Sequence, residues 1–164
     1  PAGQRANALE EKDGAARKAE GRRNIVSVEK TQHMLGIALL LDIYGWPITG
    51  TNGDGARQLY AVQDEFGMGD VTFFGYWNNA KLIGGQTEAI KASAYRKPKG
   101  GALVVIYNTA RETDTVKLTV DWDQLKSDGP LDVFDAYTKE PVAVSGNSLT
   151  LDVPRLNYRL LWIR

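Results

Sequence analysis

Three side chains in the first third of the sequence could together bind a ligand: Asp42, Tyr44 and Trp46. They occupy alternate positions directly after the apolar run 34–41. The Asp42 carboxylate can accept hydrogen bonds from hydroxyl groups, and the flat face of Trp46 can lie against a ring such as a pyranose. We predict these three residues as ligand-binding. The alternative is that Asp42 ties down the loop and Trp46, which precedes Pro47, closes the end of the domain.

The composition argues against several kinds of catalysis. His33 is the only histidine and cysteine is absent, so we do not expect a histidine-based metal site, a Ser-His-Asp triad or a thiolate nucleophile within this chain. His33 is predicted to be structural. The carboxylates of the second half lie mainly at strand ends and turns, where Asp bonds its own backbone. We therefore assign no catalytic residue, no metal ligand and no cofactor.

The position of the candidate residues depends on how segment 37–43 folds. Its nearly unbroken apolar character is typical of a strand buried on both faces, although a short buried helix has the same pattern. The Gly- and Asn-containing loop 49–55 that follows favours the strand. The next segment, up to Gly67, predicts a helix with Leu59, Val62 and Phe66 on one face. If 37–43 is instead a helix on the following domain, Asp42 lies at an ordinary helix end.

Together, the strand, loop and helix would form one βα unit over residues 33–67. A strand that is apolar on both faces needs neighbouring strands and helices. We therefore interpret this segment as the last βα unit of an α/β (TIM-like) barrel whose other units lie elsewhere. In such barrels chemistry occurs at the carboxyl ends of the strands, where Asp42, Tyr44 and Trp46 would lie.

After about residue 71 the hydrophobic period becomes two, which is typical of strands. Turn sequences such as 97–101, 126–130 and 145–147 separate the segments. The chain is therefore predicted to be mainly β, with an antiparallel β-sandwich at its carboxyl end. Its expected strands are 87–95, 102–108, 115–122, 131–137, 142–144, 148–153 and 158–163. Alternation places Val116, Leu118, Val120, Leu151, Val153 and Leu161 in its core.

The segment 73–77 contains four aromatic residues just ahead of the sandwich. Aromatic rings can stack on sugars, and they also wedge one domain against another. The position at a domain junction favours the second role. Trp122 and Trp162 are predicted to be core residues.

The domain organisation predicted from these patterns has three parts. Residues 1–32 form a charged helix or mobile tail, residues 33–80 the terminal βα part of a barrel-like domain, and residues 81–164 the β-sandwich. Twenty basic and twenty acidic side chains cancel, so we expect no nucleic-acid partner. The longest apolar run is too short for a membrane span. Because the chain starts at Pro1 without a methionine, we expect it to be a fragment or a processed chain.

Several segments together resemble the terminal portion of glycoside-hydrolase-like proteins, and in particular bacterial proteins related to glycoside hydrolase family 123, in which a barrel-like domain precedes a β-sandwich. The segments that carry the resemblance are 35–43, 66–77, 92–95, 103–108 and 158–161. They are structural rather than catalytic, so no catalytic pair is carried over onto this sequence. The resemblance implies a glycan-processing parent protein that is exported to the periplasm or outside the cell.

Three functions remain open at this point. The chain can be the non-catalytic accessory tail of a glycoside hydrolase, with the rest of that protein or another chain as its partner and a carbohydrate as a possible ligand. It can be a free-standing carbohydrate-binding or adhesion sandwich, which a solvent-facing aromatic platform would favour. It can also be a structural module of a larger assembly, which a large apolar contact with an unrelated chain would favour.

Overall fold

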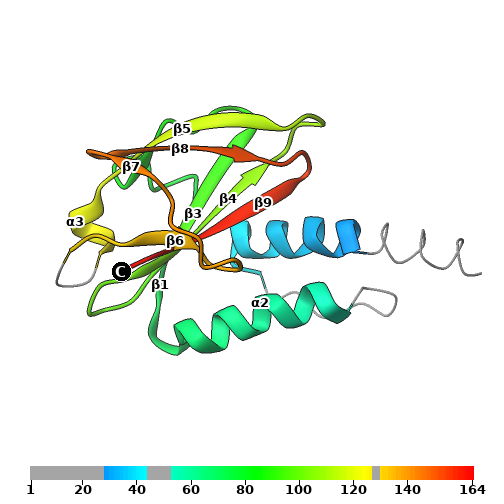
Figure 1. Ribbon diagram of the computed structural model, residues 1–164, viewed down its shortest axis with the longest axis horizontal. Coiled ribbons are helices and arrows are strands. Elements are labelled where there is room, and N and C mark those ends of the chain that lie inside the picture. Colours follow the sequence, from blue (N-terminus) through cyan, green and yellow to red (C-terminus); the bar gives the residue numbers. More distant parts are fainter. Residues whose placement is uncertain (1–27, 44–52, 127–129) are drawn as a thin grey trace, which may run out of the picture.

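The computed structural model describes residues 28–43, 53–126 and 130–164 (Figure 1). Among these residues two helices come first: one over residues 28–41, here called the first helix, and α2 over Gly53–Phe66. A short 3-10 helix, η1, follows at Met68–Asp70, and a single-turn helix, α3, lies among the strands at Trp122–Leu125. No helix among these residues is long and apolar enough to cross a membrane.

In the described parts of the chain, nine strands form two sheets in which every pairing is antiparallel. The five-stranded sheet has the order β1-β3-β4-β9-β6 and the four-stranded sheet the order β2-β5-β8-β7. The strands are β1 Thr72–Phe74, β2 Ile83–Gly84, β3 Ile90–Arg96, β4 Ala102–Asn108, β5 Asp114–Val120, β6 Val133–Asp135, β7 Val144–Ser145, β8 Ser148–Val153 and β9 Asn157–Ile163.

One hydrophobic core lies between the two sheets. Its largest fully buried side chains come from both of them, as the two faces of a sandwich require. Val116, Leu118, Val120, Val153 and Leu161 are buried there, as the alternation predicts. Leu151, the sixth predicted core residue, is partly buried and packs against this core. The predicted antiparallel sandwich is therefore confirmed.

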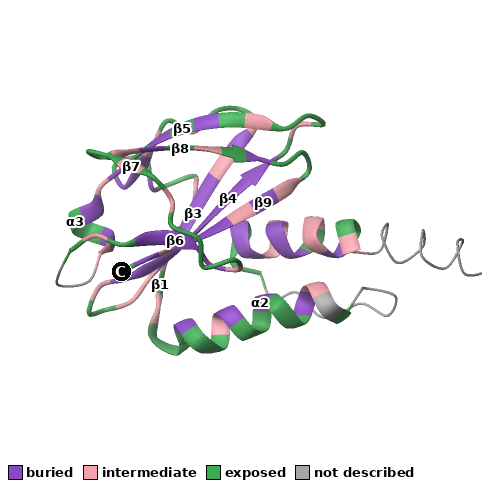
Figure 2. Cartoon of the chain, viewed as in Figure 1, coloured by how far each residue is buried: buried purple, intermediate pink, exposed green. Residues whose placement is uncertain are grey.

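A second core lies on the other face of the five-stranded sheet, beneath the first helix and α2. Strand β4 is buried along its whole length, because Val104 and Ile106 point into the first core while Leu103 and Val105 point into the second. Figure 2 shows this arrangement, with buried residues on the sheet-facing side of α2 and exposed ones on its outer side. The molecule thus has three layers: helices, five-stranded sheet and four-stranded sheet.

The prediction of a strand at 37–43 is wrong, because residues 28–41 are helical. Leu35, Leu39 and Leu40 lie on one face of this helix and are 8%, 5% and 6% exposed. The outer face of the five-stranded sheet buries that face, and the helix satisfies its own backbone hydrogen bonds, so no parallel neighbours are needed. Apolar content alone does not distinguish a buried strand from a buried helix, which is why the prediction failed. The alternative considered from the sequence, a helix packed on the sandwich, is the correct one.

The other half of the expected βα unit is confirmed. The helix α2 ends at Phe66, and Leu59, Val62 and Phe66 are all buried on one face. Phe66 meets Trp162 of β9 edge-on, with ring centroids 5.4 Å apart. This contact fixes the end of α2 on the sheet.

The predicted division into residues 1–32, 33–80 and 81–164 stays a prediction. Most of the first part lies outside the described residues, and its last residues, 28–32, are helical. Strand β1 precedes residue 81 and pairs with β3 in the five-stranded sheet. The polypeptide therefore enters that sheet within the second predicted part.

Candidate functional site

Of the three predicted ligand-binding residues, the structure places Asp42. It is exposed, directly follows the first helix, and has a left-handed backbone with φ of 54°. Tyr44 and Trp46 lie outside the described residues, so the binding set as a whole stays a prediction. The position of Asp42 at a helix end agrees with the helical alternative considered from the sequence.

Asp42 lines a groove of about 1020 Å³ between the first helix, α2 and the segment that leads into β1. This volume lies at the upper end of the range of small-molecule sites. The groove combines an apolar floor with a few polar groups on its walls. Its apolar residues include Leu35, Ala38, Leu39, Ile43, Leu59, Met68 and Val71, and its polar ones are Asp42, Tyr60, Gln63, Asp64 and Tyr95.

Tyr95, on β3, ties the groove to the sheet. Its hydroxyl donates a hydrogen bond of 2.6 Å to the carbonyl oxygen of Leu39 in the last turn of the first helix. Burial raises the pKa of Tyr95 well above its usual range, and the nearby Asp42 carboxylate raises it further. Tyr95 is therefore a neutral hydrogen-bond donor that positions the helix, and it does not supply a proton to chemistry near neutral pH.

Ser93, also on β3, joins the end of the first helix to the aromatic segment. Its hydroxyl donates to the carbonyl oxygen of Leu40 at 2.8 Å and accepts from the backbone nitrogen of Tyr76 at 3.0 Å. The rings of Phe73 and Tyr95 lie 5.0 Å apart, and those of Phe73 and Trp77 5.9 Å apart. The aromatic segment and the groove are thus neighbours on the same side of the five-stranded sheet.

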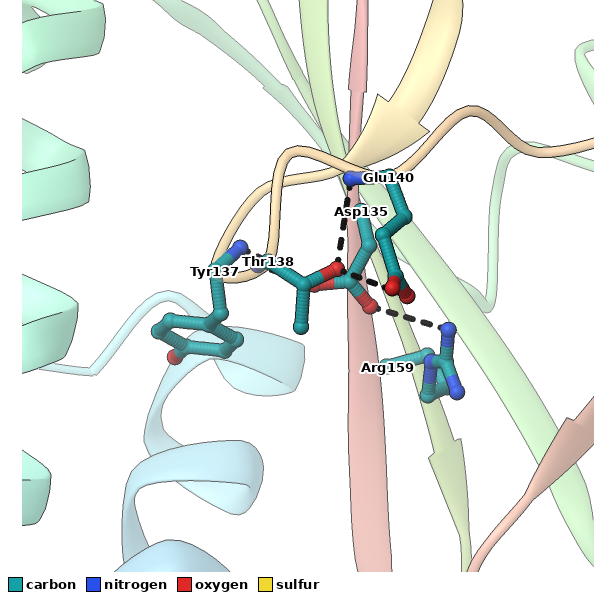
Figure 3. A network of polar contacts seen from close by, with 5 residues as sticks. All are labelled: Asp135, Tyr137, Thr138, Glu140 and Arg159. Atoms are coloured by element: carbon teal, nitrogen blue, oxygen red, sulfur yellow. Dashed lines mark hydrogen bonds and ion pairs between the residues drawn. The ribbon is translucent and has the colours of Figure 1, made fainter.

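A polar network lies around the turn after β6 (Figure 3). The buried Asp135 forms an ion pair of 3.0 Å with Arg159 of β9. Its other carboxylate oxygen accepts hydrogen bonds from the backbone nitrogens of Tyr137 and Thr138 at 2.9 and 3.1 Å. One carboxylate oxygen of Asp135 thus binds the sheet and the other binds the turn. The role of this residue is structural.

Two tyrosines beside this turn are also structural. The hydroxyl groups of Tyr137 and Tyr158 form a hydrogen bond with each other. Burial raises the pKa of Tyr158 to about 12, and burial raises the pKa of Tyr137 as well. Both phenols remain protonated at neutral pH, so their hydrogen bond persists there.

His33 is part of the contact between the first helix and the sheet. Its Nδ1 atom lies 2.5 Å from the Tyr107 hydroxyl and 3.1 Å from the carbonyl oxygen of Leu156. These contacts fit the structural role predicted for it. Within the described ranges, no three His, Asp or Glu side chains are grouped so that they could hold a metal ion.

The fold defines a class of protein: a two-sheet antiparallel β-sandwich with helices packed on one outer face. Residues 55–136, half of the 164-residue chain, match the family described as glycoside hydrolase 123, C-terminal domain. The chain therefore belongs to this family, and the resemblance stated from the sequence motifs is confirmed. The match runs from α2 to the residue after β6. No curated protein matches the sequence.

Several solved structures are similar to parts of the chain. An Anoxybacillus α-amylase is 9% identical with a TM-score of 0.46, covering 71% of this chain and 24% of that one. A putative α-N-acetylgalactosaminidase from Bacillus halodurans is 14% identical with a TM-score of 0.40. The match covers 50% of this chain and 19% of that protein. The α-galactosidase I of Mortierella vinacea is 20% identical with a TM-score of 0.38. The match covers 47% of this chain and 21% of that protein. The chain thus spans a quarter or less of the length of these proteins.

Sequence reasoning missed Trp77 as a single residue. It treated the aromatic segment 73–77 as one wedge, whereas the structure divides it: Phe73 and Phe74 lie in β1 and are partly buried, and Trp77 is 58% exposed. A signal was present in the sequence, because Gly75 and Asn78 flank the pair Tyr76 and Trp77, and Gly and Asn are turn residues.

Proposed function

We propose that this chain is the non-catalytic, carboxyl-terminal accessory portion of a glycoside hydrolase of the family 123 type. In this proposal a barrel-like catalytic domain precedes it in the parent protein, and the sandwich supports that domain. The family match over residues 55–136 supports an association with glycoside hydrolases. The accessory role is the further step, and it rests on how the sandwich uses its carboxylates.

The observation that carries the proposal is that acidic residues predicted at strand ends and turns have structural partners. Asp135 pairs with Arg159 inside the sheet, and Asp132 pairs with Arg164 at 3.0 Å. The Asp121 side chain caps α3 by accepting from the Gln124 backbone nitrogen. Glycoside hydrolysis by the common mechanisms needs two carboxyl groups flanking the scissile bond at a defined separation. Carboxylates committed to turns, caps and sheet edges are poorly suited to that task.

The helices support the accessory reading in another way. The first helix and α2 share a hydrophobic core with β4 and β9. Because this core joins the helices to the sandwich, the chain forms one packed body from residue 28 onward in its described parts. Such a body can serve as a rigid support for a neighbouring domain.

The proposal is tested in the parent enzyme by changing sandwich carboxylates to amides. Asp121→Asn and Asp132→Asn should leave kcat within about twofold of the unchanged enzyme at temperatures where both variants stay folded, since neither group would touch substrate. The matched comparison is an amide substitution of a carboxylate in the preceding domain. A loss of activity of about 100-fold or more in a folded Asp121 or Asp132 variant would contradict the proposal.

We also propose that the parent protein is exported to the periplasm or the extracellular space. The support is the family match alone, because glycans outside the cytoplasm are one class of substrate for glycoside hydrolases. Antibody detection of this domain in periplasmic and culture fractions of the source cells tests the proposal. Recovery from the cytoplasmic fraction alone would count against it.

A further inference from the structure

Trp77 is the most exposed of the large hydrophobic side chains that the structure describes, at 58%. It lies at the tip of a turn between β1 and β2. The backbone nitrogen of Asn78 donates to the carbonyl oxygen of Gly75 at 3.0 Å, which closes this turn and places Tyr76 and Trp77 at its centre. An exposed indole keeps apolar area in water that a ligand could bury.

The turn is held firmly from below. Asn79 is only 2% exposed, and its side-chain nitrogen donates to the carbonyl oxygens of Ala92 at 2.8 Å and Phe74 at 3.3 Å. The Gln86 side chain donates in turn to the Asn79 side-chain oxygen at 2.9 Å. These buried hydrogen bonds anchor the turn to β3, so Trp77 is presented from a rigid base.

The indole ring itself has a defined orientation. A Cβ atom added to Gly75 would lie 2.5, 2.6 and 2.7 Å from three adjacent atoms of the Trp77 ring, so one face of the ring rests on the Gly75 backbone. The Tyr76 ring meets it edge-on, with an interplanar angle of 82° and centroids 5.1 Å apart. The Phe73 ring lies 5.9 Å away at an interplanar angle of 59°, and Trp77 remains 58% exposed, so part of the indole is open to solvent.

We propose that Trp77 is the stacking platform of a carbohydrate subsite that takes a neutral pyranose ring. A pyranoside that has several C–H groups on one side offers a flat apolar face that matches an indole. The neighbouring exposed residues Asn78 and Lys81 supply hydrogen-bond donors for the hydroxyl groups at its rim. The choice of a sugar as ligand rests on the proposed function, whereas the geometry of the platform does not.

A protein partner is the competing occupant of this surface. Protein interfaces of ordinary size have a core of many apolar side chains. Trp77 is a single indole on a turn whose next exposed neighbours are the polar Asn78 and Lys81 and the small Ala80. This arrangement is suited to a small ring with one apolar face, so the sugar is the ligand that the geometry favours.

The test measures binding of a panel of methyl glycosides to the purified 164-residue chain by saturation-transfer NMR and calorimetry. The panel holds the glucosides, galactosides and mannosides and the corresponding N-acetylamino sugars. At least one member should bind. Trp77→Ala should weaken that binding about tenfold, equivalent to about 1.4 kcal/mol, while Trp77→Phe should retain most of it because it keeps an aromatic face. Leu156→Ala, at another exposed apolar residue, is the matched control and should change nothing.

Three results would overturn the inference. They are the absence of binding by every glycoside in the panel, equal binding by Trp77→Ala and the unchanged chain, and a Trp77→Ala effect confined to association with the catalytic domain. A parallel assay with aryl glycosides separates this inference from the proposed function. A chain that binds sugar through Trp77 and also hydrolyses it contradicts the accessory role alone, whereas an inactive chain that binds no sugar contradicts the subsite alone.

Discussion

The Tyr95 hydroxyl donates its hydrogen bond to the Leu39 carbonyl oxygen across the boundary between the five-stranded sheet and the first helix, over 2.6 Å. The acceptor belongs to the last turn of the helix, where it also accepts a longer bond of 3.4 Å from the Asp42 backbone nitrogen. Because both residues are buried, the Tyr95 bond is the shorter of the two that compensate the desolvation of this oxygen. It fixes where the helix ends against β3 and, with that, where Asp42 emerges.

Tyr95→Phe removes this donor and leaves the Leu39 carbonyl oxygen with the longer bond of 3.4 Å from the Asp42 backbone nitrogen. We expect the free energy of unfolding to fall by about 1–3 kcal/mol, with faster amide hydrogen exchange in the last turn of the first helix. Urea denaturation and exchange measured by NMR check both effects. The control is Tyr76→Phe, since Tyr76 is held through its backbone nitrogen. Equal stability of the Tyr95 variant and the unchanged chain would show that the helix is not fixed through this bond.

Gly36→Ala tests how closely the first helix approaches the sheet. An added Cβ atom would lie 2.6 Å from a ring carbon of Tyr158 and 2.8 Å from one of Tyr107. Although alanine favours helices by about 1 kcal/mol over glycine, we expect a net destabilisation of about 1–3 kcal/mol from overpacking. Thermal unfolding measures it. Gly69→Ala is the control, because nothing lies within 4 Å of its added Cβ atom. A more stable Gly36 variant would contradict the close packing.

Asp135→Asn tests the polar network beside β6. The substitution keeps an oxygen that can accept from the turn, but it removes the charge that pairs with Arg159 at 3.0 Å. Since the Asp135 side chain is 8% exposed, we expect a loss of about 1–3 kcal/mol in the free energy of unfolding. Chemical denaturation measures this loss.

The matched control for that change is Asp132→Asn, at the exposed pair of Asp132 and Arg164. The side chains of Asp132 and Arg164 are 50% and 60% exposed. Solvent therefore screens the pair, and the expected loss in the free energy of unfolding is about 0–1 kcal/mol. Equal losses at the two positions would mean that the buried pair contributes no more than a surface pair.

Stability should fall in alkaline solution because of the buried tyrosines. The pKa of Tyr158 is raised from 10.0 to about 12 in the folded chain, mainly by burial. Above pH 10 the unfolded state therefore releases a proton that the folded state keeps, and the free energy of unfolding decreases as the pH rises toward 12. Each such tyrosine contributes a slope of up to about 1.4 kcal/mol per pH unit.

Urea denaturation between pH 8 and 12 measures this dependence. The raised pKa values of Tyr95 and Tyr137 act in the same direction. Tyr158→Phe should make the alkaline slope shallower, because one of the contributing groups is gone. A free energy of unfolding that stays constant across this range would show that these phenols are not desolvated in the folded chain.

The sandwich could be predicted from the sequence because alternation is a local signal. Segments such as 102–108 and 148–153 coincide with observed strands. Strands β1 and β2 have three and two residues, which is too short for a period of two to be recognised. The strand predicted at 37–43 is wrong because exposed positions there, such as Leu41 at 36% and Ile43 at 56%, are also apolar, so polar residues do not reveal the helical period.

The candidate site was less predictable. Asp42 could be singled out because it follows the apolar run, and it does line the groove. The partners that define its surroundings, Tyr95 and Ser93, lie more than fifty residues away in the sequence, so only the packing of the helix on β3 brings them together. For Trp77, the flanking Gly75 and Asn78 indicate a turn, but the placement of its ring on the Gly75 backbone is visible only in the structure.

Turnover of aryl glycosides by the purified 164-residue chain, measured beside the parent enzyme, tests most directly whether this domain supports hydrolysis or performs it. We expect release of the aryl alcohol by the parent enzyme and none above the buffer rate by the chain, because a glycosidase needs a matched carboxylate pair that the proposal assigns to the preceding domain. Turnover by the chain that disappears when one of its own Asp or Glu residues is changed to the amide would contradict the accessory role.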